Sequence, residues 1–144
     1  MFRYRLVWPL LAVLAAAPAY SAEKKPAAPF VLKSGQELTF SVSVADGKAT
    51  LGAPKLGKLG TVQPQEGEIT VGLTPRDKDL YSQLLIVEKT AAPIDFIATG
   101  HIGEIVIDER EVCGRLGSPF QQRIGGTSWS VVLREFVVGK GTCP

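Results

Sequence analysis

Hydrophobic and polar residues alternate along several short stretches of the chain. In the clearest one, residues 38–44, four apolar side chains alternate with threonine and serine. A period of two places the apolar residues on one face of a β-strand and the polar residues on the other. Asp46 and Gly47 follow at once, and this pair tolerates the positive φ angles of a tight hairpin turn. The pattern therefore predicts a β-hairpin in which residues 48–51 form the partner strand.

Further stretches have the composition of strands. Residues 69–73 alternate, whereas residues 83–89 are apolar on both faces, as expected of a central strand between two layers. Three more runs are rich in β-branched and aromatic residues: 94–99, 102–108 and 129–138. We expect Trp129, at the start of the last run, to be a core anchor. Helical periodicity appears nowhere at length.

Glycine, proline and polar residues interrupt these stretches. Residues 52–67 contain four Gly and two Pro, which predicts a surface loop with room for one short strand. Residues 74–77 are suited to one turn of helix, because Thr74 can cap it and Pro75 fits its first position. About seven strands spaced near ten residues apart predict an all-β fold. We expect a small antiparallel sandwich, an immunoglobulin-like Greek key, or else a small barrel.

The first 22 residues have the three zones of a secretory signal peptide. Arg3 and Arg5 form a basic start, residues 6–17 are apolar, and small residues follow up to Ala22. The apolar zone is broken by Pro9 and is about twelve residues long, whereas a membrane-spanning helix needs roughly twenty. We therefore expect cleavage within 19–22 and export to the periplasm or the exterior.

Cleavage near residue 22 leaves enough chain for one domain. Residues 23–29 are too polar and proline-rich to pack, so we expect a flexible lead-in there. Residues 30–144 then form a single β domain. No later segment approaches eighteen or so consecutive apolar residues, and we expect no membrane span in the mature chain.

The chain contains two cysteines, Cys113 and Cys143. An even number of cysteines in an oxidising compartment favours pairing. Their spacing of about thirty residues fits neither a C-x-x-C redox motif nor a zinc-ligand pattern. We therefore predict one disulfide that ties the C-terminus to the middle of the fold.

Charge is balanced in the mature chain but unevenly distributed. The formal charge of +2 is carried by Arg3 and Arg5, so the basic surplus that a nucleic-acid-binding protein needs is missing. Residues 24–65 contain six Lys, and residues 66–111 contain ten acidic residues. We interpret these charges as solvated faces of a neutral domain. The alternative is a partner of complementary charge.

Candidates for catalysis are few. His101 is the only histidine, and general-base catalysis would also require a serine and an orienting acid such as Asp95 or Asp108. A lone histidine between two glycines is more often a turn residue. Residues 126–130 fall one residue short of the G-x-S-x-G nucleophile elbow and precede a strand rather than a helix. We therefore expect no catalytic residues and no enzymatic activity.

Four acidic residues lie close together at Glu104, Asp108, Glu109 and Glu111. Carboxylates can bind calcium, but on an extended strand residues 104 and 108 face one way while 109 and 111 face the other. An acidic strand edge that discourages aggregation is the better interpretation. We expect no metal, and the absence of phosphate-binding glycine motifs likewise predicts no cofactor.

The segment 113–127 is the most individual part of the chain. It resembles a loop that is pinned at one end by the predicted disulfide and displays Arg115, Phe120 and Arg123, residue types common at binding hot spots. We interpret it first as a braced connection with Phe120 tucked into the core. The alternative is a binding loop, because preorganisation of such a loop lowers the entropy lost on binding.

By elimination, we expect an exported, non-enzymatic binding or accessory protein whose partner is another extracytoplasmic protein. One alternative is an inhibitor of an exported hydrolase, a protease or a lysozyme, acting through the 114–127 loop. A second alternative is a small extracytoplasmic hydrolase that uses His101.

Overall fold

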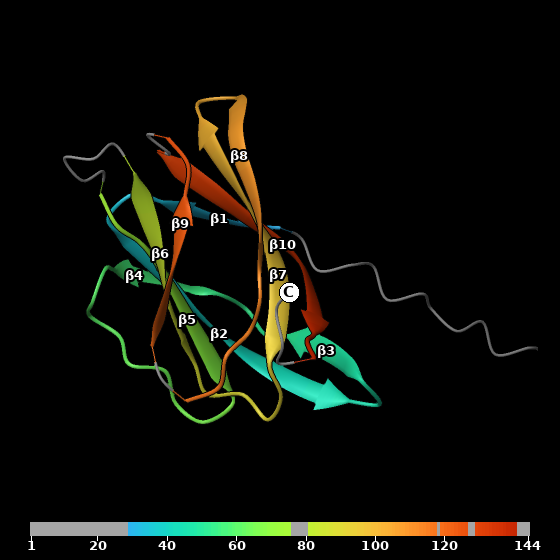
Figure 1. The fold of residues 1–144 in the computed structure, drawn as a ribbon. Helices are drawn as coiled ribbons and strands as arrows, with labels where there is room; N and C mark the ends of the chain where they lie inside the picture. Colours follow the sequence, from blue (N-terminus) through green and yellow to red (C-terminus); the bar gives the residue numbers. More distant parts are fainter. Residues whose placement is uncertain (1–28, 76–80, 118, 127–128, 141–144) are drawn as a thin grey trace, which may run out of the picture.

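The protein is described by a computed structural model that covers residues 29–75, 81–117, 119–126 and 129–140, and this part of the chain is all β. One sheet contains β1 (Phe30–Lys33), β7 (Ile94–Ile102), β8 (Ile105–Val112) and β10 (Ser130–Val138). The other contains β2 (Gln36–Ala45), β3 (Lys48–Leu51), β4 (Lys55–Lys58), β5 (Glu68–Leu73), β6 (Ser82–Glu88) and β9 (Phe120–Ile124). The two antiparallel sheets pack together (Figure 1), which confirms the all-β prediction and fits a sandwich.

The strand order does not confirm the immunoglobulin-like topology. The first sheet has the order β1-β10-β7-β8, and the second has the order β3-β2-β5-β6-β9 with β4 also paired to β2. A constant-type immunoglobulin domain divides its strands as ABED and CFG. Here β4 pairs with β2, and the chain then returns to β2 through β5. As a result β2, β5 and β6 lie side by side in the order of the chain.

The core lies between the sheets, where the inward-facing aliphatic side chains of both are buried. Phe40 on β2 contacts two phenylalanines of the opposite sheet, on β1 and β10, and the ring on β10 stacks in turn on a phenylalanine of β7. The four rings form a connected cluster with centroid separations of 4.9 to 5.6 Å: Phe30, Phe40, Phe96 and Phe136. Such edge-on and offset contacts add to the stabilisation that burial of the rings provides.

The strongest local prediction is confirmed. β2 and β3 form the expected hairpin, with Ala45 opposite Lys48 and positive φ angles of 51° at Asp46 and 70° at Gly47. The strands predicted at 69–73, 83–89, 94–99, 102–108 and 129–138 correspond to β5, β6, β7, β8 and β10. The short strand allowed within 52–67 is β4, whereas β1 and β9 were not predicted.

The expectation that Trp129 anchors the core is wrong. Its side chain is 63% exposed, because the residue lies before β10 begins and only its backbone joins the sheet. The Trp129 amide donates to the carbonyl oxygen of His101 at 2.9 Å. The inward positions of β10 belong instead to Val131 and Leu133, which are fully buried.

Several predictions concern residues outside the described ranges. These are the signal peptide, the lead-in up to residue 28, residues 76 and 77 of the expected helical turn, the motif residues 127 and 128, and Cys143. Among the described residues, no helix is long and apolar enough to cross a membrane.

Candidate binding surface at the β9 edge

Strand β9 lies inside the segment for which a loop was predicted, so that prediction is wrong for residues 120–124. The side chains of Phe120, Gln122 and Ile124 turn inward, and those of Gln121 and Arg123 are exposed. Because the inward position at 122 is a polar glutamine, the sequence hides the alternation. Among the strands of the described residues, β9 pairs with β6 alone and forms an edge of its sheet.

The backbone groups of Gln121 and Arg123 face away from the sheet. Gln83 on β6 is opposite Arg123, yet the amide and the carbonyl of Gln83 bond to Thr74, each at 2.9 Å. Residues directly opposite in an antiparallel pair alternate between bonded and non-bonded, so the Gln83 and Arg123 pair is non-bonded. Two residues earlier, Gln121 repeats this geometry. Both residues therefore direct an N–H and a C=O away from β6, and the carbonyl oxygen of Arg123 also accepts a hydrogen bond from Nε2 of Gln122 at 3.3 Å.

Two arginines flank this edge, and each lies over an aromatic ring. The guanidinium of Arg115 is 5.7 Å from the ring centroid of Phe120, and that of Arg123 is 5.6 Å from the centroid of Tyr81. In the described part of the chain neither arginine forms an ion pair with a carboxylate. The ring contacts preorganise both cations without neutralising them. We refer to Tyr81, Arg115, Gln121 and Arg123 as the β9 surface.

The three predicted binding residues are thus only partly brought together. Arg115 and Phe120 are in contact, and Phe120 is half-buried against the core, so it serves both the surface and the packing. Arg123 lies farther along β9 beside Tyr81. The sequence analysis missed Tyr81, because nothing in the pattern before strand 83–89 distinguishes it.

The position of Arg115 is set by hydrogen bonds of its neighbours. The Gly114 amide donates to Oδ1 of Asp95 at 2.9 Å, and the Gly117 amide donates to the carbonyl oxygen of Glu88 at 3.4 Å. The segment 113–117 is therefore attached to the turn between β6 and β7. Cys113 begins this segment, and its predicted disulfide with Cys143 stays a prediction because Cys143 lies outside the described residues.

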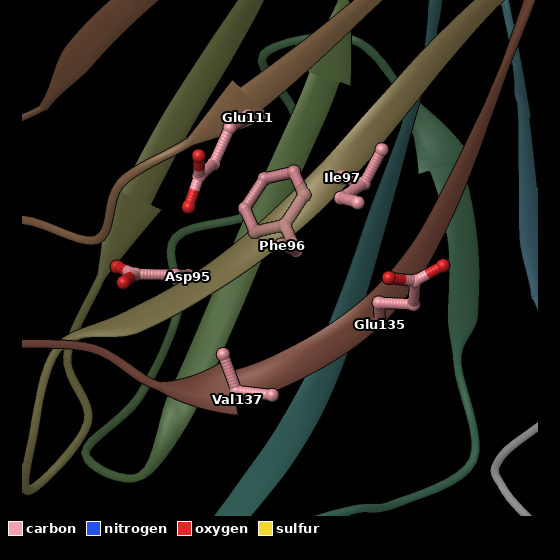
Figure 2. Close-up of a pocket in the computed structure, with 6 residues that line it drawn as sticks. All are labelled: Asp95, Phe96, Ile97, Glu111, Glu135 and Val137. Atoms are coloured by element: carbon pink, nitrogen blue, oxygen red, sulfur yellow. The ribbon is translucent and has the colours of Figure 1, made fainter.

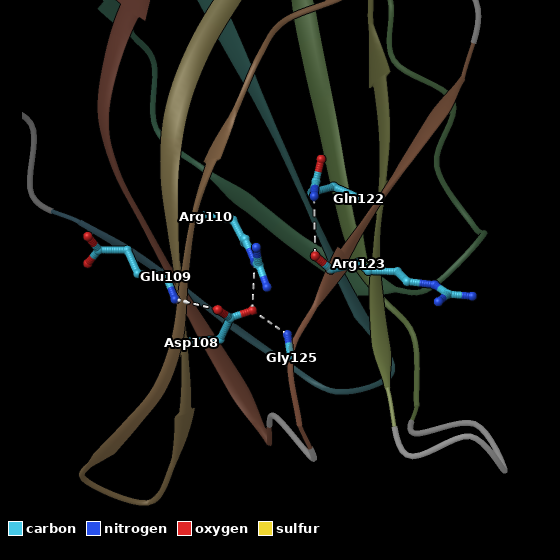
Figure 3. A network of polar contacts seen from close by, with 6 residues as sticks. All are labelled: Asp108, Glu109, Arg110, Gln122, Arg123 and Gly125. Atoms are coloured by element: carbon cyan, nitrogen blue, oxygen red, sulfur yellow. Dashed lines mark hydrogen bonds and ion pairs between the residues drawn. The ribbon is translucent and has the colours of Figure 1, made fainter. Parts of the chain in front are cut away.

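The other end of β9 is attached to β8 through Asp108 (Figure 3). Oδ2 of Asp108 accepts hydrogen bonds from the Gly125 amide at 2.5 Å and from Nε of Arg110 at 2.9 Å. Burial raises the pKa of Asp108, but the Gly125 amide, Arg110 and the Glu109 amide lower it by more, so the net pKa lies below its usual value. The ionised carboxylate thus links the edge strands of the two sheets.

His101 lies within β7 rather than in a turn. Within the described ranges, no hydrogen bond or ion pair joins its imidazole to Asp95 or Asp108; Asp95 accepts the Gly114 amide and Asp108 accepts the Gly125 amide. These contacts therefore give no support to the alternative of a hydrolase that uses His101.

A shallow pocket of about 150 Å³ opens on the sheet that contains β7, β8 and β10. Figure 2 shows Asp95 and Glu111 on one side of it and Glu135 on the other, with Phe96 between them. Within the described residues, no group of three or more acidic, histidine or cysteine side chains could hold a metal ion. Asp108 bonds toward β9, while Glu109 and Glu111 are exposed, so the four clustered acids predicted as an acidic strand edge do not converge.

Comparison of the chain with protein-family models, with curated proteins and with solved structures finds no match.

Proposed function

We propose that this protein is an exported, non-enzymatic binding protein that holds an extended, acidic segment of a partner polypeptide against β9. The observation that carries the proposal is the pair of outward-facing backbone positions, Gln121 and Arg123, on an exposed edge strand. An added strand bonds to such groups, and pockets or charges beside the edge select its side chains. Arg115 and Arg123 favour carboxylates at those positions.

Export and a disulfide belong to the same proposal. The three-zone leader supports translocation, and oxidation of Cys113 with Cys143 would then brace the segment that carries Arg115. A constrained segment loses less entropy on binding.

The strand-addition geometry is tested by Gln121→Pro. Proline removes an N–H that points away from β6, so the bonds of β9 to β6 stay intact and the fold is retained. We expect this variant to lose binding of short peptides in which Val and Glu alternate, measured by calorimetry, while its thermal unfolding stays cooperative. Unchanged peptide affinity would exclude strand addition at β9.

The charge preference is tested by Arg123→Glu, with Lys48→Glu on β3 as the matched reversal at the far edge of the same sheet. We expect the first variant to weaken peptide binding by about tenfold at low salt and the second to have no effect. Peptides in which Lys replaces Glu should bind each variant no more tightly than the Glu peptides bind the wild-type protein. An equal response to the two reversals would reject the β9 surface.

The braced segment also supports a second function, inhibition of an exported hydrolase. Leu116 is 47% exposed and lies between Arg115 and Gly117, where the two hydrogen bonds described above restrict the backbone. A restricted, exposed loop is what an inhibitor presents to an active site. Titration against exported proteases and lysozymes tests this, and the absence of inhibition at micromolar concentration would reject it.

A further inference from the structure

A buried carboxyl lies beneath the segment that carries Arg115. Glu88, the last residue of β6, is 1% exposed. Its Oε1 accepts the Ile94 amide at 2.7 Å and lies 2.9 Å from the hydroxyl of Thr90. In the described part of the chain its Oε2 has no hydrogen-bond partner. Gly114 covers this oxygen so closely that a Cβ added there would be 2.9 Å from Oε2.

The number of available hydrogens favours a neutral carboxyl. The Thr90 hydroxyl lies 2.9 Å from Oε1 of Glu88 and 2.7 Å from the carbonyl oxygen of Ala92, but it has only one hydrogen to donate. When the proton of a neutral Glu88 lies on Oε1, its O–H donates to Thr90 and Thr90 donates to Ala92, so both contacts contain a hydrogen, while a lone pair of Oε1 still accepts the Ile94 amide. With an ionised Glu88, one contact would bring two lone pairs together.

The net effect of the surroundings also favours the neutral form. Burial, the largest influence, raises the pKa of Glu88; a hydrogen bond donated by the Thr90 hydroxyl and the amides of Ile94 and Arg115 lower it in part, and the Asp95 carboxylate raises it again.

Among the residues that the structure describes, no ion pair joins Glu88 to a basic side chain. The Arg115 guanidinium lies over Phe120, and Lys89, next along the chain, follows with the opposite side-chain direction expected in an extended chain. Glu68, on the neighbouring strand β5, uses its carboxylate to accept the Gln65 amide at 2.9 Å.

We propose that Glu88 is a pH-sensitive latch beneath the β9 surface, whose neutral form holds the segment 113–117 in place and whose ionised form releases Arg115. Loss of the proton to solvent leaves a buried charge next to Asp95, and this charge is stabilised only if water enters where Gly114 now packs. The consequence for partner binding rests on the proposed function: affinity falls as Glu88 ionises.

Carboxyl and amide NMR of the wild-type protein tests the latch directly. We expect Glu88 to titrate above its ordinary value of 4.5, with the amides of Gly114, Arg115 and Gly117 shifting at the same midpoint. Their hydrogen-exchange protection factors should fall by about tenfold through this transition. A midpoint for Glu88 that the three amides do not share would overturn the proposal.

Glu88→Gln provides the matched variant, and Glu111→Gln, an exposed carboxylate on β8, is its control. We expect protection of residues 114–117 to be independent of pH in the first and to follow wild type in the second. A pH response that persists in Glu88→Gln would assign the effect to another group.

Peptide binding separates this proposal from the proposed function. The ratio of the affinities of wild type and Glu88→Gln for the alternating Val and Glu peptide, taken at the same pH, cancels titration of the peptide itself. We expect this ratio to fall as pH rises. A ratio constant with pH, with titrating amides, rejects the regulatory role alone, whereas a latch that responds without any peptide binding rejects the proposed function alone.

Discussion

At the scale of single residues, buried carboxylates are positioned mainly by backbone amides. Glu37 on β2 is 3% exposed and accepts the amides of Gly60 at 2.8 Å, Thr61 at 3.0 Å and Val62 at 2.6 Å. Hydrogen bonds to an ionised acceptor are stronger than neutral ones. One side chain on β2 thus holds the loop that follows β4, as Glu88 and Asp108 each hold a connection elsewhere.

We expect Glu37→Gln to lower the free energy of unfolding by about 1–3 kcal/mol, because an amide group places a donor where the loop also offers donors. Glu66→Gln, at an exposed position of the same region, should stay within about 0.5 kcal/mol of wild type. Urea denaturation of the three proteins measures both effects. Equal losses in the two variants would show that the buried hydrogen bonds contribute nothing specific.

The lowered pKa of Asp108 predicts how the free energy of unfolding depends on pH. Because its net pKa in the folded protein lies below the usual value of 3.8, its stabilising contribution is complete above that value and is lost as pH falls through the lowered pKa. Asp108→Asn should therefore destabilise the protein at neutral pH, with a difference from wild type that shrinks in acid. Denaturant titrations over this pH range measure the difference, and a constant gap would contradict the assignment.

At the scale of elements, the segments that connect the strands also pack tightly against one another. The turn from β6 to β7 and the segment 113–117 are distant in sequence, yet they pack together through Gly114, whose Cβ would collide with the backbone nitrogen and oxygen of Ile94. Glycine is required here by the close approach of two backbones. This contact brings Arg115 to the start of β9.

We expect Gly114→Ala to destabilise the protein by about 1–3 kcal/mol through overpacking and to weaken peptide binding by displacing Arg115. Gly57→Ala on β4 is the control, since the nearest atom to its added Cβ is 3.5 Å away. Thermal unfolding and calorimetry of both variants provide the comparison. A Gly114→Ala protein as stable as the control would mean that the two segments separate at little cost.

At the scale of the whole molecule, the end of the chain is joined to its beginning and its middle. β10 lies between β1 and β7 in the first sheet, so folding of this sheet requires the last strand. The predicted disulfide from Cys113 to Cys143 would add a covalent link to the same arrangement, beyond the end of β10.

The native exported protein should begin within residues 20–23 and weigh two hydrogens less than its reduced form. Reduction should lower the free energy of unfolding by about 3–4 kcal/mol in the chain-entropy model. A double Cys113→Ser, Cys143→Ser variant should be insensitive to reductant. Intact mass spectrometry decides the matter: a product that retains Met1, or one with two free thiols, contradicts the proposed export and disulfide.

The sequence by itself determined what depends on neighbouring residues. Alternation in 38–44 and the turn at Asp46 and Gly47 specify β2, β3 and their hairpin, because side-chain period and turn geometry are local properties. The residue types of Arg115, Phe120 and Arg123 drew attention to the segment that contains β9, and their role in binding stays a prediction. The short run 120–124 escaped detection because one inward position is a glutamine.

Only the tertiary structure decided what depends on strand order. Within the described ranges β6 is the only strand that pairs with β9, so β9 is an edge of its sheet, and this edge places Tyr81 beside Arg123 and sets Gln121 outward. Glu88 lies under Gly114 because β8 leads back across the turn that follows β6. Such contacts join residues far apart in sequence, and their free energy comes from burying both partners at once. No local pattern along the chain encodes which segments meet in this way.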